Sequence, residues 1–258
     1  NVSRTQILAT VGPSSIDEEV LKKMLQSKVD AIRFNFSWLD KEKASEYFRV
    51  VRKVGEELNK KVLIIADLPG PRVKSEEGHT YDQSIPSGLT DKDKELIKFC
   101  IEKNVDYIAL SFVSGRKEVE MCREILTDNS AKQKIIAKVE RQVAVDSIHE
   151  IVETADAVMI ARGDLGQEIP FEKLPFIQSE IIKKCKVVGK PVIVATQMLF
   201  SMVENDKPTR AEVTDVSEAV MEGADVLMLS DETAMGKYPV ESVKAMERII
   251  LEAESHTN

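Results

Sequence analysis

Charged side chains stand in this sequence where the neighbouring residues are apolar. Lys138 lies inside the apolar run 135–139, and Glu140 follows that run directly. A cation in a buried run costs free energy unless a carboxylate or a bound anion compensates its charge. A structural ion pair with Glu140 or Asp164 is one explanation, and a site for an anionic substrate is the other. The residues by themselves leave both open.

Glu140 and Asp164 each follow an apolar run, so they would end neighbouring strands and could share one divalent cation. His79, His149 and His256 lie away from these positions, in a polar segment, a helix and the tail. An oxygen-only ligand set favours Mg²⁺ or Mn²⁺ over Zn²⁺. The positions of the histidines also argue against Ser-His-Asp and Cys-His catalysis.

The segment 161–166, Ala-Arg-Gly-Asp-Leu-Gly, places two glycines directly after an apolar run. We expect a turn here, whose main-chain N–H groups could face a phosphate or carboxylate. Together with Arg33, Lys138 and a metal ion, such a turn would provide what phosphoryl or enolate chemistry needs, namely positive groups where oxygen charge develops. A purely structural tight turn is the alternative.

Most of these candidate side chains sit just past an apolar run. The others in such positions are Asn35, Ser37, Asp67, Thr196, Gln197, Ser230, Asp231 and Glu232. Any one of them alone is more often a solvated strand end or a helix cap than a functional group.

The elements that must position these residues alternate along the whole chain. Strand-like runs are predicted at 6–11, 31–35, 62–67, 107–111, 135–139, 157–161, 192–195 and 226–229. Helical periodicity is predicted at 17–27, 41–60, 91–103, 118–126, 145–154, 173–188, 212–222 and 240–254. Eight β/α units in about 250 residues predict an α/β fold of the TIM (β/α)8 barrel type, with a doubly wound open sheet as the alternative. In a barrel the strand ends converge on one mouth, where catalytic groups lie.

One segment, 75–89, is polar, contains Gly78, Pro86 and Gly88, and has neither period. We interpret it as an exposed linker inside a single domain that spans residues 1–258.

Composition excludes several classes of protein. The 258 residues carry a formal net charge of −8, with no concentrated basic block, which argues against binding to nucleic acid or an anionic membrane surface. No apolar run is long enough to span a bilayer. The three cysteines, Cys100, Cys122 and Cys185, are far apart and predict reduced structural thiols and a cytoplasmic location.

Several longer motifs carry a family resemblance. They are ILATVGPSS at 7–15, IRFNFS at 32–37, MIARGDLGQEIP at 159–170, PVIVATQML at 191–199 and PTRAE at 208–212. In this order they resemble the A domain of pyruvate kinase, which is itself a TIM barrel.

The resemblance implies a role for each candidate residue. Lys138 would neutralise the phosphoryl group in flight and the pyruvate enolate, Arg33 would bind the substrate phosphate, and Thr196 would assist protonation of the enolate. The implied binding groups are Glu140 and Asp164 for Mg²⁺, Asn35, Ser37 and Asp67 for K⁺, and the backbone of Ala161, Arg162, Gly163 and Asp164 for the substrate carboxylate.

The sequence also departs from the family. By this resemblance, the small B domain that covers the nucleotide would be reduced to the linker at 75–89, and the C-terminal domain of the family would be missing. Trp38, Pro69, Arg141 and Asp231 stand where His, Lys or Gln, Asn, and Gly are usual. These changes remove groups expected to bind or cover the nucleotide. The groups expected to bind the substrate phosphate, the metal and the enolate are kept.

Three functions follow from the resemblance. The first is Mg²⁺- and K⁺-dependent phosphoryl transfer from phosphoenolpyruvate to ADP in glycolysis. The second is metal-dependent enolate chemistry on pyruvate or another 2-oxo acid without nucleotide, such as decarboxylation, aldol cleavage or C–C bond formation. The third is a non-catalytic ligand-binding barrel. The apolar segment 199–202 also makes a homo-oligomer an expectation.

Overall fold

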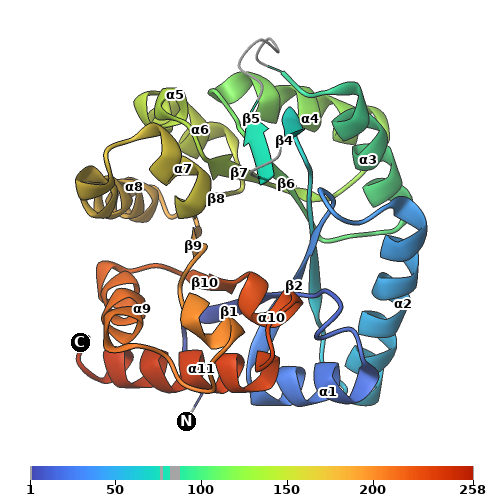
Figure 1. Ribbon diagram of the computed structural model, residues 1–258. Helices are drawn as coiled ribbons and strands as arrows, with labels where there is room; N and C mark the ends of the chain where they lie inside the picture. Colours follow the sequence, from blue (N-terminus) through green and yellow to red (C-terminus); the bar gives the residue numbers. More distant parts are fainter. Residues whose placement is uncertain (1, 76–77, 82–87, 258) are drawn as a thin grey trace. The chain divides into compact units, whose positions relative to one another are not determined.

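The computed structural model describes residues 2–75, 78–81 and 88–257. Strands and helices alternate along these residues (Figure 1). The strand order is β1-β10-β9-β8-β7-β6-β3-β2, which is that of a closed parallel barrel. The predicted TIM (β/α)8 fold is therefore confirmed, and the open sheet is not found.

Each strand of the barrel overlaps one predicted apolar run. The strands are β1 (Gln6–Thr10), β2 (Val29–Asn35), β3 (Leu63–Asp67), β6 (Tyr107–Leu110), β7 (Lys134–Val139), β8 (Ala157–Ala161), β9 (Val192–Ala195) and β10 (Val226–Leu229). Most of their residues are buried. Strands of a parallel sheet that is covered on both faces are apolar almost throughout, which is why these runs were visible in the sequence.

The long helices also overlap their predicted ranges. They are α1 (Glu18–Ser27), α2 (Lys41–Glu57), α3 (Asp91–Glu102), α4 (Arg116–Asp128), α8 (Leu174–Val187), α9 (Arg210–Glu222) and α11 (Pro239–Ser255). The predicted helix at 145–154 instead forms two short helices, α5 (Gln142–Asp146) and α6 (Ile148–Thr154). The short helices α7 (Arg162–Glu168) and α10 (Asp231–Ala234) and the 3₁₀ turns η1 (Phe171–Lys173) and η2 (Phe200–Val203) were not predicted. Among the described residues, the helices lack the length and apolar character that would cross a bilayer.

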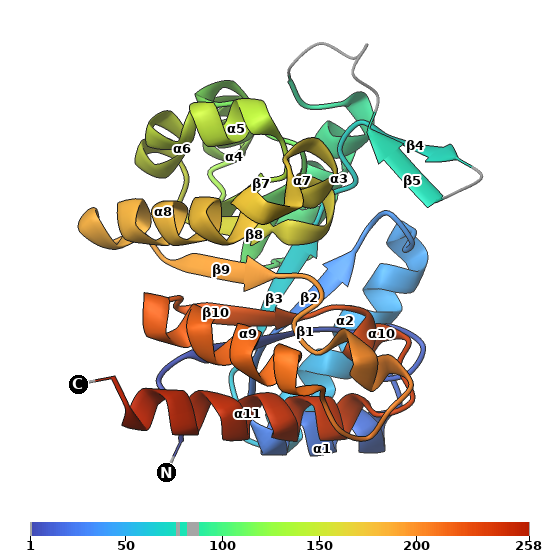
Figure 2. The same ribbon diagram turned by 60° about the vertical axis from the view of Figure 1, so that its left-hand side comes forward.

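A two-stranded antiparallel sheet stands where the sequence predicts the start of a linker. Strand β4 (Arg72–Ser75) pairs with β5 (Gly78–Tyr81), with Arg72 opposite Tyr81 (Figure 2). The sequence shows no strand period here because main-chain pairing of two strands needs no buried face. The rest of the predicted linker, 76–77 and 82–87, lies outside the described residues.

Residues 1–258 divide into two compact units. The first unit comprises Asn1–Phe34, Glu42–Ile64 and Pro191–Asn258, and the second comprises Asn35–Lys41 and Ile65–Lys190. The prediction of a single domain remains a prediction.

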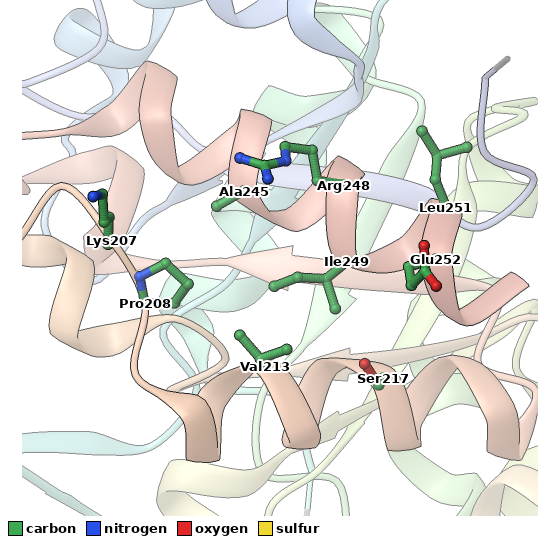
Figure 3. A pocket seen from close by; sticks show the side chains of 9 residues that line it. All are labelled: Lys207, Pro208, Val213, Ser217, Ala245, Arg248, Ile249, Leu251 and Glu252. Atoms are coloured by element: carbon green, nitrogen blue, oxygen red, sulfur yellow. The ribbon is translucent and has the colours of Figure 1, made fainter.

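The first unit contains the strand order β2-β1-β10-β9. Helix α11 packs against α9 and α1, and α10 packs against α11 and η2. A groove between α9 and α11 is lined by Val213, Ser217, Arg248 and Ile249, with Lys207 at one end (Figure 3).

The second unit contains the strand order β3-β6-β7-β8. Helix α4 packs against α3, α6 and β7. Cys100, Cys122 and Cys185 lie on α3, α4 and α8 as free buried thiols, as the sequence predicts. Burial raises the pKa of Cys100 and of Cys122 to about 12, so both thiols are protonated at neutral pH.

Helix α9 begins in the PTRAE motif at a capping box. The Thr209 hydroxyl accepts a hydrogen bond from the Glu212 N–H, and Glu212 in turn accepts one from the Thr209 N–H. Glu212 also accepts bonds from the Ser201 N–H at 2.7 Å and the Ser201 hydroxyl at 2.6 Å. Burial alone would raise the pKa of Glu212, but these hydrogen bonds outweigh it, and the pKa is lowered.

Replacing Glu212 by Ala should lower the free energy of unfolding by about 1–2 kcal/mol at neutral pH, because the cap of α9 and the bonds to Ser201 are lost. A lowered pKa stabilises the fold above the ordinary pKa of Glu, and this contribution disappears as the pH falls through the lower pKa of the folded state. The difference from wild type in urea unfolding should therefore shrink in acid. Glu218→Ala, an exposed change on the same helix, is the control, and an equal effect of both variants would contradict the assignment.

Candidate functional site

Four of the predicted site residues meet in the second unit because their strands are neighbours. Asp67 is the last residue of β3, Lys138 lies in β7, and Glu140 follows β7. Asp164 lies in the first turn of α7, which follows β8. The carboxyl ends of parallel strands lie at one edge of the sheet, so side chains as far apart in sequence as Asp67 and Lys138, 71 positions, come into contact there.

Lys138 lies between two of the carboxylates and a hydroxyl group. Its Nζ lies 3.0 Å from Asp67 Oδ1, 3.1 Å from Glu140 Oε1 and 3.0 Å from the Ser111 hydroxyl. The Lys138 side chain is 3% exposed and the Glu140 side chain is fully buried. The ion pair with Glu140 that the sequence left as one explanation is therefore present, and Asp67 supplies a second one.

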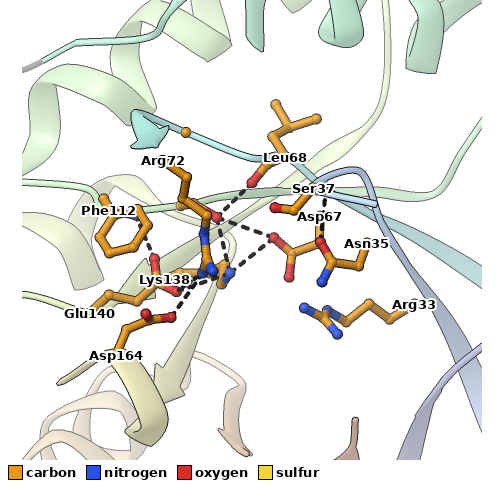
Figure 4. A network of polar contacts seen from close by, with 12 residues as sticks. Arg33, Asn35, Ser37, Asp67, Leu68, Arg72, Phe112, Lys138, Glu140 and Asp164 are labelled. Carbon is orange, nitrogen blue, oxygen red and sulfur yellow. Dashed lines mark hydrogen bonds and ion pairs between the residues drawn. The ribbon is translucent and has the colours of Figure 1, made fainter. Parts of the chain in front are cut away.

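A second cation, Arg72, joins the carboxylates of Glu140 and Asp164. Its Nη2 lies 2.8 Å from Asp164 Oδ2 and 3.4 Å from Glu140 Oε1. The guanidinium carbon lies 4.9 Å from the centroid of the Phe112 ring. Five side chains thus alternate in charge, in the order Asp67, Lys138, Glu140, Arg72 and Asp164 (Figure 4). We call this set the charge network.

The two carboxylate oxygens of Glu140 have different partners. Oε1 faces Lys138 and Arg72, whereas Oε2 accepts a hydrogen bond from the Phe112 N–H at 2.6 Å. Burial raises the pKa of Glu140, and the charge of Lys138 opposes that rise. For Arg72, burial is the largest single influence and lowers the pKa, but the nearby carboxylates outweigh it and the pKa is raised. Arg72 therefore stays charged.

The loops around the network contain constrained backbone. Phe112 has φ 56°, a left-handed conformation that is unusual for a bulky residue. In this conformation the Phe112 N–H points toward Glu140 and donates its hydrogen bond to Oε2. Gly70 has φ 63°, and a Cβ at this position would lie 3.0 Å from Cβ of Ser111. The Gly70 N–H donates to Asp93 Oδ1 at 3.1 Å.

The predicted K⁺ ligands lie in the second unit and have protein contacts. Asn35 Oδ1 accepts a hydrogen bond from the Ser37 N–H at 3.0 Å. Asp67 Oδ1 faces Lys138, and the neighbouring Leu68 carbonyl accepts a bond from the Ser111 hydroxyl at 2.6 Å. Binding of K⁺ by these three residues stays a prediction.

Arg33 and Thr196 belong to the first unit. Arg33 is buried at the end of β2, and its Nη1 donates to the Thr10 hydroxyl at 2.9 Å. Thr196 follows β9 with φ 73°, again a strained conformation for a β-branched residue. The loop beyond it is held by Glu232, which accepts hydrogen bonds from the Leu199 N–H at 3.0 Å and the Ser230 N–H at 2.7 Å.

The segment that the sequence predicts as a glycine turn is a helix. Strand β8 ends at Ala161, and α7 begins at Arg162 without an intervening loop. The prediction of a loop-like turn was wrong because β8 passes directly into α7. Gly163 lies in the first turn of that helix with ordinary helical geometry. The first N–H groups of an α-helix have no hydrogen-bond partner within the helix. The donors expected for a phosphate or carboxylate are therefore still main-chain N–H groups, now at the start of α7.

Sequence reasoning missed Arg72 and Ser111, and with them the main-chain N–H of Phe112. Ser111 does stand just past an apolar run, so the rule that found Asp67 could have found it. Arg72 carries no such signal because it follows the loop after β3 and begins β4. The role of the Phe112 N–H depends on backbone conformation and has no signal in residue type.

Glu140 and Asp164 converge on a single cationic group, so their arrangement suits a cation with oxygen ligands. In the part of the chain that the structure describes, there is no cluster of three or more His, Cys, Asp or Glu side chains that could hold a metal ion. Mg²⁺ is nevertheless often bound by one or two carboxylates, with water and substrate oxygens completing its shell. The donors therefore fit Mg²⁺ provided that it takes the place of the Arg72 guanidinium.

Comparison with known proteins identifies similar sequences. The family model described as pyruvate kinase, barrel domain, matches residues 2–86 and 81–243. Proteins named pyruvate kinase from Staphylococcus epidermidis and Staphylococcus aureus are 34% identical over 334 and 335 aligned positions, covering 98% of this chain. The chain spans 57% of the length of these relatives.

The alignments also show where the relatives differ from this chain. The 334 aligned positions of the first relative exceed the 258 residues of the chain by 76, so at least that many positions have no counterpart here. The family match is split into two pieces that overlap at residues 81–86. A split there indicates that the family has additional residues at this point of the barrel.

Replacing Lys138 by Met should lower the free energy of unfolding by about 3–5 kcal/mol, because it removes the buried cation that Asp67 and Glu140 share. Urea unfolding followed by circular dichroism measures the change. Adding Asp67→Asn should recover part of the loss, since one of the stranded charges is removed. Lys183→Met, an exposed change on α8, is the control, and an unchanged midpoint in Lys138→Met would contradict the ion-pair assignment.

Proposed function

The chain belongs to the pyruvate kinase family, matching its barrel domain, and on this premise we propose that it binds phosphoenolpyruvate or pyruvate and transfers the phosphoryl group to ADP. The relatives from Staphylococcus epidermidis and Staphylococcus aureus are also named pyruvate kinase. The observation that carries the proposal is the burial of Lys138 at a strand end, among carboxylates. Such a charge costs free energy, and its use by a reaction that develops oxygen charge would explain its presence.

In the proposed reaction Lys138 provides fixed positive charge. Its ammonium group would stabilise negative charge on the phosphoryl and enolate oxygens, as preorganised cations do in a site shielded from water. Asp67, Ser111 and Glu140 hold the ammonium group in place. Their contacts support a positioned catalytic group rather than a mobile surface lysine.

Two metal ions belong to the proposal. Glu140 and Asp164 would hold Mg²⁺ or Mn²⁺, and a bound divalent cation would supply Lewis-acid stabilisation of the phosphoryl and enolate oxygens. Asn35, Ser37 and Asp67 would hold K⁺. Support for both comes from the family membership and from the oxygen-rich donors that these residues offer.

Other residues would bind and orient the substrate. The main-chain N–H groups from Ala161 to Asp164, at the start of α7, would face the substrate carboxylate. From the family resemblance, Arg33 would bind the substrate phosphate, and Thr196 would assist protonation of the enolate. The strained φ of Thr196 is consistent with such a role.

A second candidate is metal-dependent enolate chemistry on pyruvate or another 2-oxo acid without nucleotide. One observation favours it, namely that relatives carry at least 76 aligned positions that this chain lacks, and that the family match is split at residues 81–86. If those additional positions cover the nucleotide in the relatives, this chain has only the segment 75–89 in their place. A barrel without that cover would retain the charge network but would not exclude water from around ADP.

We further propose that residues 1–258 act as one barrel domain in the cytoplasm and can self-associate. The free buried cysteines support a reducing compartment. Phe200, at the start of η2, is 49% exposed and is available for a contact between copies of the chain.

Pyruvate and ATP formation tests the first candidate. Wild type should form both in equal amounts from phosphoenolpyruvate and ADP with Mg²⁺ and K⁺, and Lys138→Ala should reduce the rate by about 100-fold or more because fixed positive charge is lost. Lys183→Ala is the matched control, and circular dichroism reports whether each variant is folded.

The outcomes separate the candidates. Equal rates in wild type and folded Lys138→Ala would overturn the role of Lys138. If ATP is not formed, exchange of the pyruvate methyl protons in deuterated water with Mg²⁺ would support the second candidate, and the lack of exchange as well would exclude both.

A further inference from the structure

Arg72 contacts the carboxylates of both residues that are proposed above to hold a divalent cation, Glu140 and Asp164. Its Nη2 is within 3.4 Å of a carboxylate oxygen of each residue. Both contacts are made by the same nitrogen, so the two carboxylates converge on one point of positive charge. Glu140 and Asp164 would together hold such an ion.

The charges of the network explain why a cation is needed there. Without Arg72, the three carboxylates of Asp67, Glu140 and Asp164 together with Lys138 carry a formal charge of −2. With Arg72 the remainder is −1. The guanidinium therefore supplies half of the charge that a divalent ion would supply, and a divalent ion added beside it would be repelled.

Arg72 is held at this place by its position in the chain and by the contacts of one nitrogen, Nη2. It begins β4 just after Gly70, whose N–H donates to Asp93 and where an added Cβ would lie 3.0 Å from Cβ of Ser111. Its guanidinium carbon lies 4.9 Å from the Phe112 ring centroid. Yet Arg72 Nε is buried and has no hydrogen-bond partner among the described residues. An arginine usually uses two nitrogens in its strongest contacts with carboxylates. The hydrogen-bonding capacity of the Arg72 guanidinium is therefore only partly used, which favours its replacement by another cation.

We propose that Arg72 is an internal counter-ion that occupies the divalent-metal position between Glu140 and Asp164 and lowers the affinity of the chain for the metal. Binding of the metal requires the guanidinium of Arg72 to leave this position. Arg72 is the first residue of β4, so the start of that strand must then change its contacts. Arg72 is thus a positioning residue for the carboxylates when metal is absent. The proposal rests on the metal site of the proposed function, but not on any catalytic turnover.

Binding of Mn²⁺ alone, without substrate or nucleotide, tests the inference. Titration followed by electron paramagnetic resonance of the free ion gives the dissociation constant for wild type, Arg72→Gln, Arg72→Lys and Arg123→Gln. Arg72→Gln should bind Mn²⁺ about 10-fold more tightly or better than wild type, because a neighbouring positive charge is removed. Arg72→Lys, which keeps the charge, should remain close to wild type. Arg123 pairs with Asp156 on the surface, so its variant should not change the affinity.

A thermal melt provides the second measurement. Arg72→Gln leaves two carboxylates without their shared cation and should melt at a lower temperature than wild type. Saturating Mn²⁺ should raise its melting temperature more than that of wild type, since a ligand stabilises the state that binds it. Adding Glu140→Gln to Arg72→Gln should abolish both the binding and the rise.

Equal Mn²⁺ affinity in wild type and Arg72→Gln would overturn the inference, as would tighter binding in Arg72→Lys to the same extent as in Arg72→Gln. A lack of Mn²⁺ binding by every variant would also overturn it. The turnover assay is separate, because tighter Mn²⁺ binding by Arg72→Gln would uphold the inference even if pyruvate were never formed.

Discussion

Lys138 contacts Asp67 and Glu140 at 3.0 and 3.1 Å, and all three side chains are almost inaccessible to water. Removing these charges from water costs several kcal/mol per ion, and only close opposite charges and good hydrogen bonds return that cost. The arrangement of the second unit meets this requirement. Strands β3, β6 and β7 are neighbours, so Asp67, Ser111 and Lys138 come from adjacent strand ends, and Glu140 needs only the turn after β7 to reach Lys138.

The loops of the second unit serve the same requirement. The left-handed conformation of Phe112 turns its N–H toward Glu140, and Gly70 lets the chain pass close to Ser111 before Arg72 enters the network. Strained backbone of this kind persists only when surrounding contacts hold it. The charge network and these loop conformations therefore depend on each other, and the fold keeps its charged groups fixed before any ligand arrives.

Family membership and the charge network bear on function in different ways. The family match assigns the barrel domain, while the alignments show that relatives contain residues without a counterpart here. What the chain retains is a set of carboxylates and cations at strand ends that suits an anionic substrate and a divalent ion. Lys138 and Arg72 neutralise the three carboxylates of that set to within one formal charge.

The sequence by itself determined the eight strands, the long helices and the order of the barrel, because burial on both faces of a parallel sheet leaves apolar runs such as 157–161 that coincide with β8. It also indicated that Lys138 needed a compensating carboxylate, since an isolated cation in an apolar run is costly whatever the fold. It did not show β4 and β5, whose pairing requires no apolar period, nor the direct passage from β8 into α7. The tertiary structure alone decided that Asp67 shares Lys138 with Glu140 and that Arg72 lies between Glu140 and Asp164. Those contacts join residues 68–92 positions apart, and no local pattern records which distant charges meet when strand ends and loops pack together.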